Sequence, residues 1–484
     1  MTTHTSDHTL RTETLVSDDG FRLLIGGELV HGDDTMDVVN PATAAALATC
    51  PRASAQQFHE AVAAARTAFG PWSRSSLKTR RRLLNTIADI IDSHTDQLAR
   101  LLTAEQGKPL PDATHEVQAT AVFFRHVANL DYDVRVLEDG DARRVELRRR
   151  PLGVVAAILP WNAPLLLVAF KVPAALLTGN TVVVKPAATT PLTTLLLARL
   201  IADATPPGVI NIVTDAGDLG DVLTEHPDIA KVTFTGSTAT GYKVLANAAK
   251  SLKRVTLELG GNDAAIVLDD ADPGEVAAGI YQGAFWNCGQ VCLAIKRLYV
   301  HDSLYDQVVA ELAALAGEAV VGDGMDAATH MGPLQNRAQY EKVKEFLADA
   351  RHNGRVVAGG VVSEDSGYFV TPTIVADVHE GSRLVDEEQF GPILPVLRYT
   401  DVDDAIERAN ATGYGLGASV WSSSIDRAEE IALQLEAGTV WVNKHIDVAP
   451  HIPQAGAKQS GLGAELGDIG LLEYTQVQVL NIKK

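Results

Sequence analysis

The chain has 484 residues, a length that predicts two or three domains rather than one compact core. Hydrophobic residues make up 46% of the chain and charged residues 21%, which is typical of a globular protein and excludes a fibrous or disordered one. A formal net charge of -20 argues against a nucleic-acid partner, because such a surface needs a basic patch.

Location is predicted from three features of the sequence. No apolar stretch reaches the ~20 residues needed to cross a bilayer, so no membrane partner is expected. The N-terminus is polar and has no signal-peptide core, and residues 1–20 are predicted to form a disordered tail. The three cysteines are too few for a disulfide framework, and these features together predict a cytoplasmic protein.

In chain order, the first predicted elements are a short strand pair around Gly26-Gly27 and helices between residues 55 and 104. After Pro151 apolar strands alternate with helices, and the strands are predicted at residues 154–159, 181–185, 209–213 and 231–234. Strands joined by helical crossovers are typical of a doubly wound parallel sheet.

A second alternation predicts strands near residues 264–268, 297–300, 393–398 and 438–442. The fold class is therefore α/β, with two doubly wound domains, one from residues 21–130 and 151–258 and the other from residues 259–467. Residues 131–150 and 468–484 fit neither domain. They predict a small β arm that pairs between subunits, because an isolated hairpin is unstable in water.

Two residues have side chains suited to acyl chemistry. Cys292 follows a Gly-containing turn, where a thiol can face a pocket and act as a nucleophile, although a lone cysteine is commonly a small buried residue. Glu258 ends an apolar strand, and an apolar environment raises the pKa of a carboxyl group toward that of a general base. The alternative for Glu258 is a surface acid at a strand end.

Two further segments follow predicted strands. Asn162 comes after the strand at 154–159, where its amide could stabilise an oxyanion or cap the next helix. The turn that contains Gly236, Ser237 and Gly241 could admit a phosphate at a helix N-terminus. It lacks the G-x-G-x-x-G spacing, so a plain tight turn stays open as the alternative.

The joint order of these segments resembles the aldehyde dehydrogenase superfamily over nearly the whole chain. The resemblance rests on a set of motifs in the family order: Ile25-Gly26-Gly27, Asn40-Pro41, Glu105-Gln106-Gly107-Lys108, Pro160-Trp161-Asn162, Lys185-Pro186, Gly236-Ser237-Thr238, Glu258-Leu259-Gly260-Gly261, Gln290-Val291-Cys292, Gly332-Pro333, Glu388-Gln389-Phe390-Gly391-Pro392 and Lys458-Gln459-Ser460-Gly461. So many matches in one order are far more specific than any single motif.

The resemblance implies oxidation of an aldehyde to a carboxylic acid with NAD or NADP. It implies that Cys292 forms a thiohemiacetal and then a thioester, that Asn162 and the Cys292 N–H hold the oxyanion, and that Glu258 activates water. It further implies a homodimer or homotetramer, no metal, and a set of cofactor-binding residues: Pro160, Trp161, Lys185, Gly236, Ser237, Gly241, Glu388 and Phe390.

Three departures from the family pattern stand out. Ala188 replaces the usual acid that binds the adenosine ribose, so with Lys185 as the remaining charge we expect weak discrimination between NAD and NADP. Gln454, in Pro453-Gln454-Ala455-Gly456, replaces the usual Phe, which is expected to affect loop packing rather than chemistry. Asn262-Asp263 also departs from the usual pair and has no assigned role.

Competing hypotheses remain for the activity. A CoA-acylating dehydrogenase is the alternative within enzymes, and a retained Glu258 favours hydrolysis over it. A non-catalytic structural protein is the alternative from another class. Residues that resemble the substrate channel are mainly apolar, so an uncharged aliphatic or aromatic aldehyde is favoured: Phe170, Trp286, Val291, Leu293 and residues 445–452.

Cys288 lies four residues before Cys292. On a helix this spacing would put both thiols on one face, where a reversible disulfide could protect the nucleophile. The alternative is that Cys288 is only a small packing residue.

Overall fold

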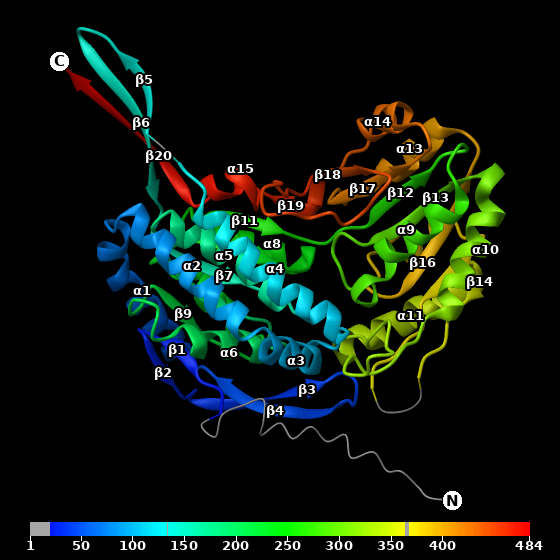
Figure 1. Cartoon of the computed structure of the whole chain (residues 1–484), viewed down its shortest axis with the longest axis horizontal. Coiled ribbons are helices and arrows are strands. Elements are labelled where there is room, and N and C mark those ends of the chain that lie inside the picture. Colours follow the sequence, from blue (N-terminus) through cyan, green and yellow to red (C-terminus); the bar gives the residue numbers. More distant parts are fainter. Residues whose placement is uncertain (1–19, 133, 364–366) are drawn as a thin grey trace, which may run out of the picture.

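The computed structural model describes residues 20–132, 134–363 and 367–484. Within these residues the chain forms two α/β halves that lie side by side and a narrow β arm that projects from the first half (Figure 1). The disordered tail predicted for residues 1–20 falls, apart from Gly20, outside the described residues.

The first half is built on an eight-stranded sheet whose five central strands run parallel. The four strands predicted from the first alternation are confirmed as β7, β8, β9 and β10. In sheet order the strands are β19 (Gly461–Leu462), β11 (Arg254–Glu258), β10 (Ile229–Thr235), β7 (Val154–Ile158), β8 (Thr181–Lys185), β9 (Ile210–Ile212), β1 (Leu23–Ile25) and β2 (Glu28–Val30).

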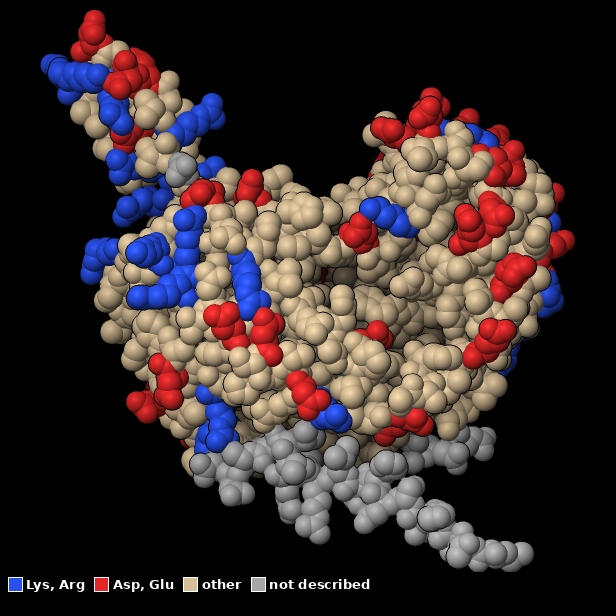
Figure 2. All heavy atoms as spheres, in the orientation of Figure 1, with Lys and Arg blue, Asp and Glu red and all other residues tan. Residues whose placement is uncertain are grey.

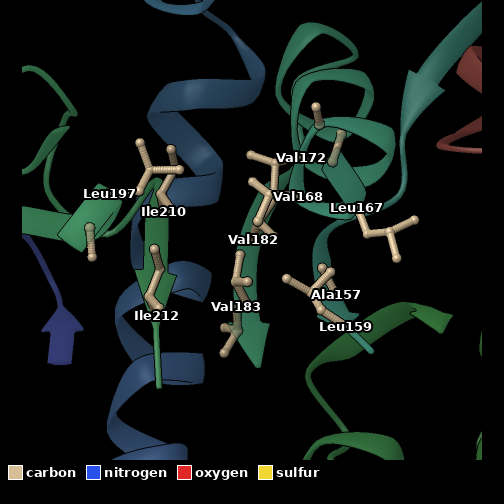
Figure 3. Close-up of a cluster of buried hydrophobic side chains, with 14 of the residues drawn as sticks. Ala157, Leu159, Leu167, Val168, Val172, Val182, Val183, Leu197, Ile210 and Ile212 are labelled. Atoms are coloured by element: carbon tan, nitrogen blue, oxygen red, sulfur yellow. The ribbon is translucent and has the colours of Figure 1, made fainter. Parts of the chain in front are cut away.

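Strands β7, β8 and β9 in the middle of this sheet are buried along their whole length. Strands β7 and β8 read VVAAI and TVVVK, nearly continuous apolar runs typical of parallel strands that are covered on both faces. Figure 3 shows their side chains packed with those of α5 (Pro164–Leu177) and α6 (Leu192–Ile201). This packing holds the carboxyl ends of the strands at fixed positions.

The other helices of the first half are α1 (Ala55–Ser73), α2 (Leu77–Ser93), α3 (Thr95–Gln106), α4 (Leu110–Ala128), α7 (Gly220–Glu225) and α8 (Thr238–Ala249). Helix α1 begins at a capping box, in which the Ser54 side chain accepts from the Gln57 N–H and the Gln57 side chain accepts from the Ser54 N–H. A separate hairpin, β3 (Asp34–Asn40) with β4 (Ala45–Arg52), lies beside these elements.

The second half is built on a seven-stranded sheet that is parallel except at β14. Its strands, in sheet order, are β14 (Arg355–Ala358), β15 (Thr373–Ala376), β16 (Ile393–Tyr399), β13 (Ile295–His301), β12 (Asp263–Val267), β17 (Gly417–Trp421) and β18 (Thr439–Val442). Its helices are α9 (Pro273–Phe285), α10 (Asp302–Glu318), α11 (Arg337–Asn353), α12 (Arg383–Asp386), α13 (Val402–Asn410) and α14 (Ile425–Ala432).

One strand near the end of the chain belongs to the sheet of the first half. Strand β19 follows the second sheet in sequence, yet it pairs antiparallel with β11 of the first sheet. Helix α15 (Gly467–Leu472) then lies against α5, and the chain leaves the body as β20. The C-terminal segment therefore ties the second half to the carboxyl end of β11.

The arm is a three-stranded antiparallel sheet in the order β20 (Thr475–Lys483), β6 (Arg143–Pro151) and β5 (Arg135–Asp139). Of the segments predicted as an arm, residues 135–139, 143–151 and 475–483 form this sheet, whereas residues 467–472 form helix α15. Figure 2 shows basic side chains gathered on the arm and a hollow between the two halves of the body. Apolar side chains of the arm are also exposed, among them Val136, Leu137, Val477 and Val479.

Candidate active site

A cavity of about 340 Å³ lies where the two halves meet. It is lined by residues that follow β7, β10 and β11 of the first sheet and by loops of the second half. Open parallel sheets bind their ligands at the carboxyl ends of the strands, and this cavity occupies that place. Cys292, Glu258 and Asn162, which are far apart in the sequence, all line it.

Cys292 lies in a turn between the short 3-10 helix Trp286–Gly289 and β13. Its thiol is half-buried, and burial raises the pKa of Cys292 to about 12, an effect that the nearby Lys296 ammonium opposes. Lys296 Nζ donates to the carbonyl oxygens of Val291 at 2.9 Å and Cys292 at 2.7 Å. This buried lysine, which the sequence analysis missed, therefore fixes the backbone of the nucleophile turn.

The backbone before the nucleophile is tightly constrained. Asn287, Cys288 and Gly289 have consecutive left-handed φ values of 51°, 60° and 69°. Only Gly fits the third position, because a Cβ there would lie 2.4 Å from the Gly391 carbonyl oxygen. The turn thus packs against the Gly391 backbone within the second half, which fixes its place.

Glu258 is the last residue of β11, and its side chain is buried in the cavity wall. Neither carboxylate oxygen has a hydrogen-bond partner. Burial and the neighbouring Glu465 carboxylate raise its pKa well above the usual value, while Lys171 opposes the shift. A buried carboxyl group with free oxygens and a raised pKa is suited to exchange a proton with a ligand in the cavity.

Glu465 and Lys171 form a buried ion pair beside Glu258, with 2.5 Å between Glu465 Oε1 and Lys171 Nζ. Lys171 also donates to the hydroxyls of Thr233 and Thr235. The sequence analysis did not assign these residues to the site. A signal was available, because Lys171 interrupts an otherwise apolar helix, and a buried lysine requires a charged partner.

Asn162 reaches across to the nucleophile turn from the end of β7. The side-chain Nδ2 of Asn162 donates to the Gln290 backbone carbonyl oxygen at 3.0 Å. The backbone carbonyl oxygen of Asn162 accepts from Lys108 Nζ and from Asn287 Nδ2, at 3.0 Å each. Lys108 is in turn paired with buried Glu116. This network sets the position of Asn162 relative to Cys292. It does not support the alternative of a helix cap, because the cap of α5 is Ala163.

Most of the expected cofactor residues line the same cavity. They are Pro160, Trp161, Gly236, Ser237, Glu388 and Phe390. The rings of Trp161 and Phe390 meet edge to face at 5.3 Å between centroids. Glu388 Oε1 accepts from the Gly261 N–H at 3.0 Å, so this carboxylate joins the end of β11 to the second half.

Two expected cofactor residues are not among the described residues that line the cavity. Gly241 lies in α8, where a Cβ would come 2.5 Å from Leu259 Cδ2, so this glycine allows close packing of the helix. Lys185 lies at the end of β8 and pairs with Asp215, with 2.6 Å between Nζ and Oδ1. Asp215 had no assigned role in the sequence analysis.

The far end of the cavity is apolar. Phe170, Trp286, Val291 and Leu293 line it as expected, together with Ile446 and Val448 from the 445–452 stretch. Of the described residues that line the cavity, none is an arginine.

His445 does not line the cavity, although the sequence analysis placed the whole 445–452 stretch along the channel. Its ring nitrogens lie 2.8 Å from the Leu293 carbonyl oxygen and 3.0 Å from Ser419 Oγ, so it is a structural residue. The described residues contain no group of three or more His, Cys, Asp and Glu side chains arranged to hold a metal ion. None of their helices is long and apolar enough to cross a bilayer.

Cys288 does not share a helix face with Cys292. The 3-10 helix that contains Cys288 ends at Gly289, and Cys292 lies beyond it in a turn. Cys288 is buried in the hydrophobic core of the second half and lines a different, smaller cavity. The helical argument for a protective disulfide is therefore wrong, and the structure favours a packing role.

Comparisons with known proteins agree with this arrangement. The model of the aldehyde dehydrogenase family matches residues 29–480. The chain is 42% identical to a phenylacetaldehyde dehydrogenase of Pseudomonas fluorescens, with 96% of this chain and 97% of that protein covered. It is 40% identical to retinaldehyde dehydrogenase 3 of Rattus norvegicus, with 92% and 89% covered.

A solved NAD+ complex of an aldehyde dehydrogenase from Bacillus cereus superimposes with a TM-score of 0.94, at 39% identity and 96% coverage of both chains. Fold, cavity and relatives thus define one class of protein, the NAD(P)-dependent oxidoreductases that act on aldehydes. The chain belongs to the aldehyde dehydrogenase family, and its activity is the NAD(P)-dependent oxidation of an aldehyde.

Proposed function

We propose that this enzyme converts an uncharged aldehyde to the free acid through a covalent intermediate on Cys292, with NAD as the preferred hydride acceptor. The observation that carries the proposal is the convergence of Cys292, Glu258 and Asn162 on one cavity. These side chains supply the nucleophile, the base and the oxyanion donor that acyl chemistry on a thiol requires.

The wall around Gly236 and Ser237 suits a dinucleotide. A Cβ on Gly236 would lie 2.5 Å from the Phe234 ring, so only glycine keeps this turn open. Ser237 caps the 12-residue helix α8, whose first N–H groups favour a phosphate. The Bacillus cereus relative was solved with NAD+, which supports the same cofactor here. When bound, the cofactor accepts a hydride from the substrate carbon.

The first stage joins the aldehyde to the enzyme. At neutral pH the Cys292 thiol must lose its proton to a base, because burial holds its pKa near 12. Glu258 shares the cavity and has both oxygens free, so we assign this proton to it. The sulfur then bonds to the carbonyl carbon. A second N–H of the Asn162 amide and the Cys292 N–H stabilise the oxyanion.

The second stage releases the acid. Loss of a hydride from the thiohemiacetal leaves a thioester on Cys292. Glu258 first releases the proton taken from Cys292 to the solvent. Water then attacks the acyl carbon and gives a proton to Glu258, the carbon–sulfur bond breaks, and the thiolate takes that proton from Glu258 to restore the thiol. The retained Glu258 supports water over CoA as the acyl acceptor, because attack by CoA needs no activated water.

The apolar end of the cavity supports an aromatic or long aliphatic aldehyde. Phe123 stacks on Phe170 at 5.2 Å between ring centroids, and Leu166, Leu167 and Val448 extend the same wall. Two relatives act, by their names, on phenylacetaldehyde and retinaldehyde, both of which are apolar. We therefore propose an aldehyde of this class rather than a semialdehyde acid.

We further propose that residues 21–130 and 151–258 bind the cofactor, that residues 259–467 supply the nucleophile, and that the arm joins subunits into a homodimer or homotetramer. The three cysteines are all free thiols in the described part of the chain, a state that suits the cytoplasm.

An assay with and without CoA tests this function. Phenylacetaldehyde, a long aliphatic aldehyde and succinic semialdehyde would be supplied with NAD, and both NADH and acid would be quantified. We expect equal amounts of NADH and free acid from the apolar aldehydes without CoA, and no NADH from Cys292→Ala. NADH formation that requires CoA, or that survives in Cys292→Ala, would contradict the proposal.

A further inference from the structure

Gln454 places an amide in the wall of the active-site cavity, at the position where the family pattern has Phe. Its side chain is only 9% exposed, and Oε1 has no hydrogen-bond partner. A buried amide oxygen without a partner is destabilising, so a group that satisfies it is expected in the cavity.

The backbone places Gln454 next to Glu465. The two residues form an antiparallel bridge in which each N–H donates to the other's carbonyl oxygen at 2.8 Å. In such a hydrogen-bonded pair the side chains leave the strands on the same face, with Cβ atoms about 5 Å apart. Both side chains line the active-site cavity, so they face it side by side.

Glu465 also has one free oxygen in this cavity. Its Oε1 is occupied by Lys171 and Thr233, whereas Oε2 has no partner. Glu258, in the same wall, has both oxygens free. Gln454, Glu465 and Glu258 therefore all line the cavity with side-chain oxygens that have no hydrogen-bond partner. An ordered water needs two to four polar partners, and the cavity is large enough to hold one.

We propose that Gln454 is a positioning residue that, with the free oxygen of Glu465, holds the water that Glu258 activates for thioester hydrolysis. One hydrogen of this water points to Glu258, and the other is shared between Gln454 Oε1 and the free oxygen of Glu465, which lie side by side. The water gives one proton to Glu258 as its oxygen bonds to the acyl carbon, and the thiolate leaves and takes this proton from Glu258. This inference rests on the proposed function and concerns only its hydrolytic stage.

The test uses Gln454→Met, which keeps the length of the side chain but removes the amide. The acyl-enzyme is formed with NAD and either phenylacetaldehyde or a ring-hydroxylated analogue, and its decay is followed by intact mass. We expect NADH formation in the first turnover to be nearly unchanged and acyl-enzyme decay to be slowed by about tenfold with both aldehydes. Hydroxylamine, which needs no positioned water, should capture a larger share of the acyl group in the variant than in the wild type.

Gln454→Asn provides a matched variant, because a shorter amide should recover part of the hydrolysis rate if a water is held there. Unchanged decay in Gln454→Met would overturn the proposal. So would an effect seen only as a raised KM for the hydroxylated aldehyde, which would make Gln454 a substrate-binding residue. An acyl-enzyme that never forms in the wild type would instead refute the proposed function.

A crystal structure of the wild type keeps the test decisive if the variants fail to fold. We expect an ordered water within hydrogen-bond distance of both the Gln454 amide and the Glu465 carboxylate. Absence of this water at a resolution that shows its neighbours would overturn the proposal.

Discussion

Lys185 and Asp215 form a buried ion pair at the carboxyl ends of β8 and β9. Lys185 is 8% exposed at its side chain and Asp215 is 0% exposed. The second oxygen of Asp215 accepts from the Leu219 N–H at 2.7 Å, which fixes the carboxylate. The pair is neutral as a whole, so Lys185 offers no net positive charge to a 2′-phosphate.

Selectivity for NAD is therefore expected instead of the weak discrimination predicted from Ala188 and an unpaired Lys185. We expect NADH to bind about tenfold more tightly than NADPH, and Asp215→Asn to reduce this ratio by strengthening NADPH binding, because it frees the charge of Lys185. Fluorescence titration with each dinucleotide measures the ratio. Asp218→Asn, which alters an exposed pair with Arg52 in the same loop, is the control. Equal affinities in the wild type would refute this account.

Glu258 should set the lower limb of the pH–rate profile. Its raised pKa keeps it protonated at low pH, where it cannot accept a proton, so kcat should rise as pH increases through that pKa. Glu465→Gln removes a repelling charge and leaves Lys171 unpaired, and both changes lower the pKa of Glu258. The limb should move to lower pH. A limb that stays in place would show that another group controls it.

The residues that sequence could identify are those in the recurring motifs. Cys292, Glu258 and Asn162 could be placed in one site because a family order joins them, although their spacing in the chain is wide. Lys296, Glu465 and Asp215 could not, because each acts through a partner that is brought near only by the fold. The prediction that Cys288 and Cys292 share a helix face was wrong because the backbone at Cys288 has a left-handed φ and does not continue a helix to Cys292.

At the scale of elements, Gly438 and Ala455 show how closely the loop of 453–456 is packed. A Cβ on Gly438, which precedes β18, would lie 1.5 Å from the Ala455 carbonyl oxygen. The same loop presents Gln454 to the cavity, so its position depends on this contact. Such an overlap with backbone cannot be relieved by a rotamer change.

Gly438→Ala is therefore expected to destabilise the protein by at least ~3 kcal/mol. It should lower the Tm in a thermal scan at fixed rate. Gly317→Ala is the matched control, because Gly317 lies in α10 with nothing within 4 Å of its added Cβ, and alanine favours a helix. A Tm for Gly438→Ala equal to that of the wild type would contradict this prediction, because it would show that the loop of 453–456 can shift without loss of stability.

The pattern of apolar residues was sufficient for the central strands β7 and β8, whose five residues are mostly apolar. It was insufficient for β17 and β15, which were not predicted. Strand β17 reads GASVW, in which glycine and serine interrupt the apolar pattern, and β15 reads TIVA, which has only four residues, so neither stands out from a loop or a helix end. The pairing of β19 with β11 also lay beyond sequence reasoning, since two residues carry no periodicity.

At the scale of the whole molecule, the arm exposes apolar side chains on both faces of β20. Val477 and Val479 lie on one face, and Leu480 and Ile482 on the other. A projecting three-stranded sheet with such faces is expected to be covered by another subunit. The arm also has a free edge at β20, nine residues long.

The pair of substitutions Val477→Asp and Val479→Asp should dissociate the oligomer, because two carboxylates would be buried in the contact. Sedimentation velocity or light scattering measures the change in mass. Leu252→Asp with Leu433→Asp adds the same charge at two exposed apolar positions outside the arm and serves as the control. A wild-type protein that is already monomeric at micromolar concentration would contradict the proposed role of the arm.

The central claim, that Cys292 carries the acyl group until Glu258 activates water, is tested most directly in Glu258→Gln. This variant would be mixed with NAD and phenylacetaldehyde, quenched in acid and examined by intact and peptide mass. We predict that the Cys292 peptide still gains the mass of one acyl group, more slowly because Gln cannot take the thiol proton. This species should accumulate because hydrolysis is slowed more than acylation, while Cys292→Ala gains none. An unmodified Cys292 peptide in a variant that still forms NADH at the wild-type rate would contradict the account.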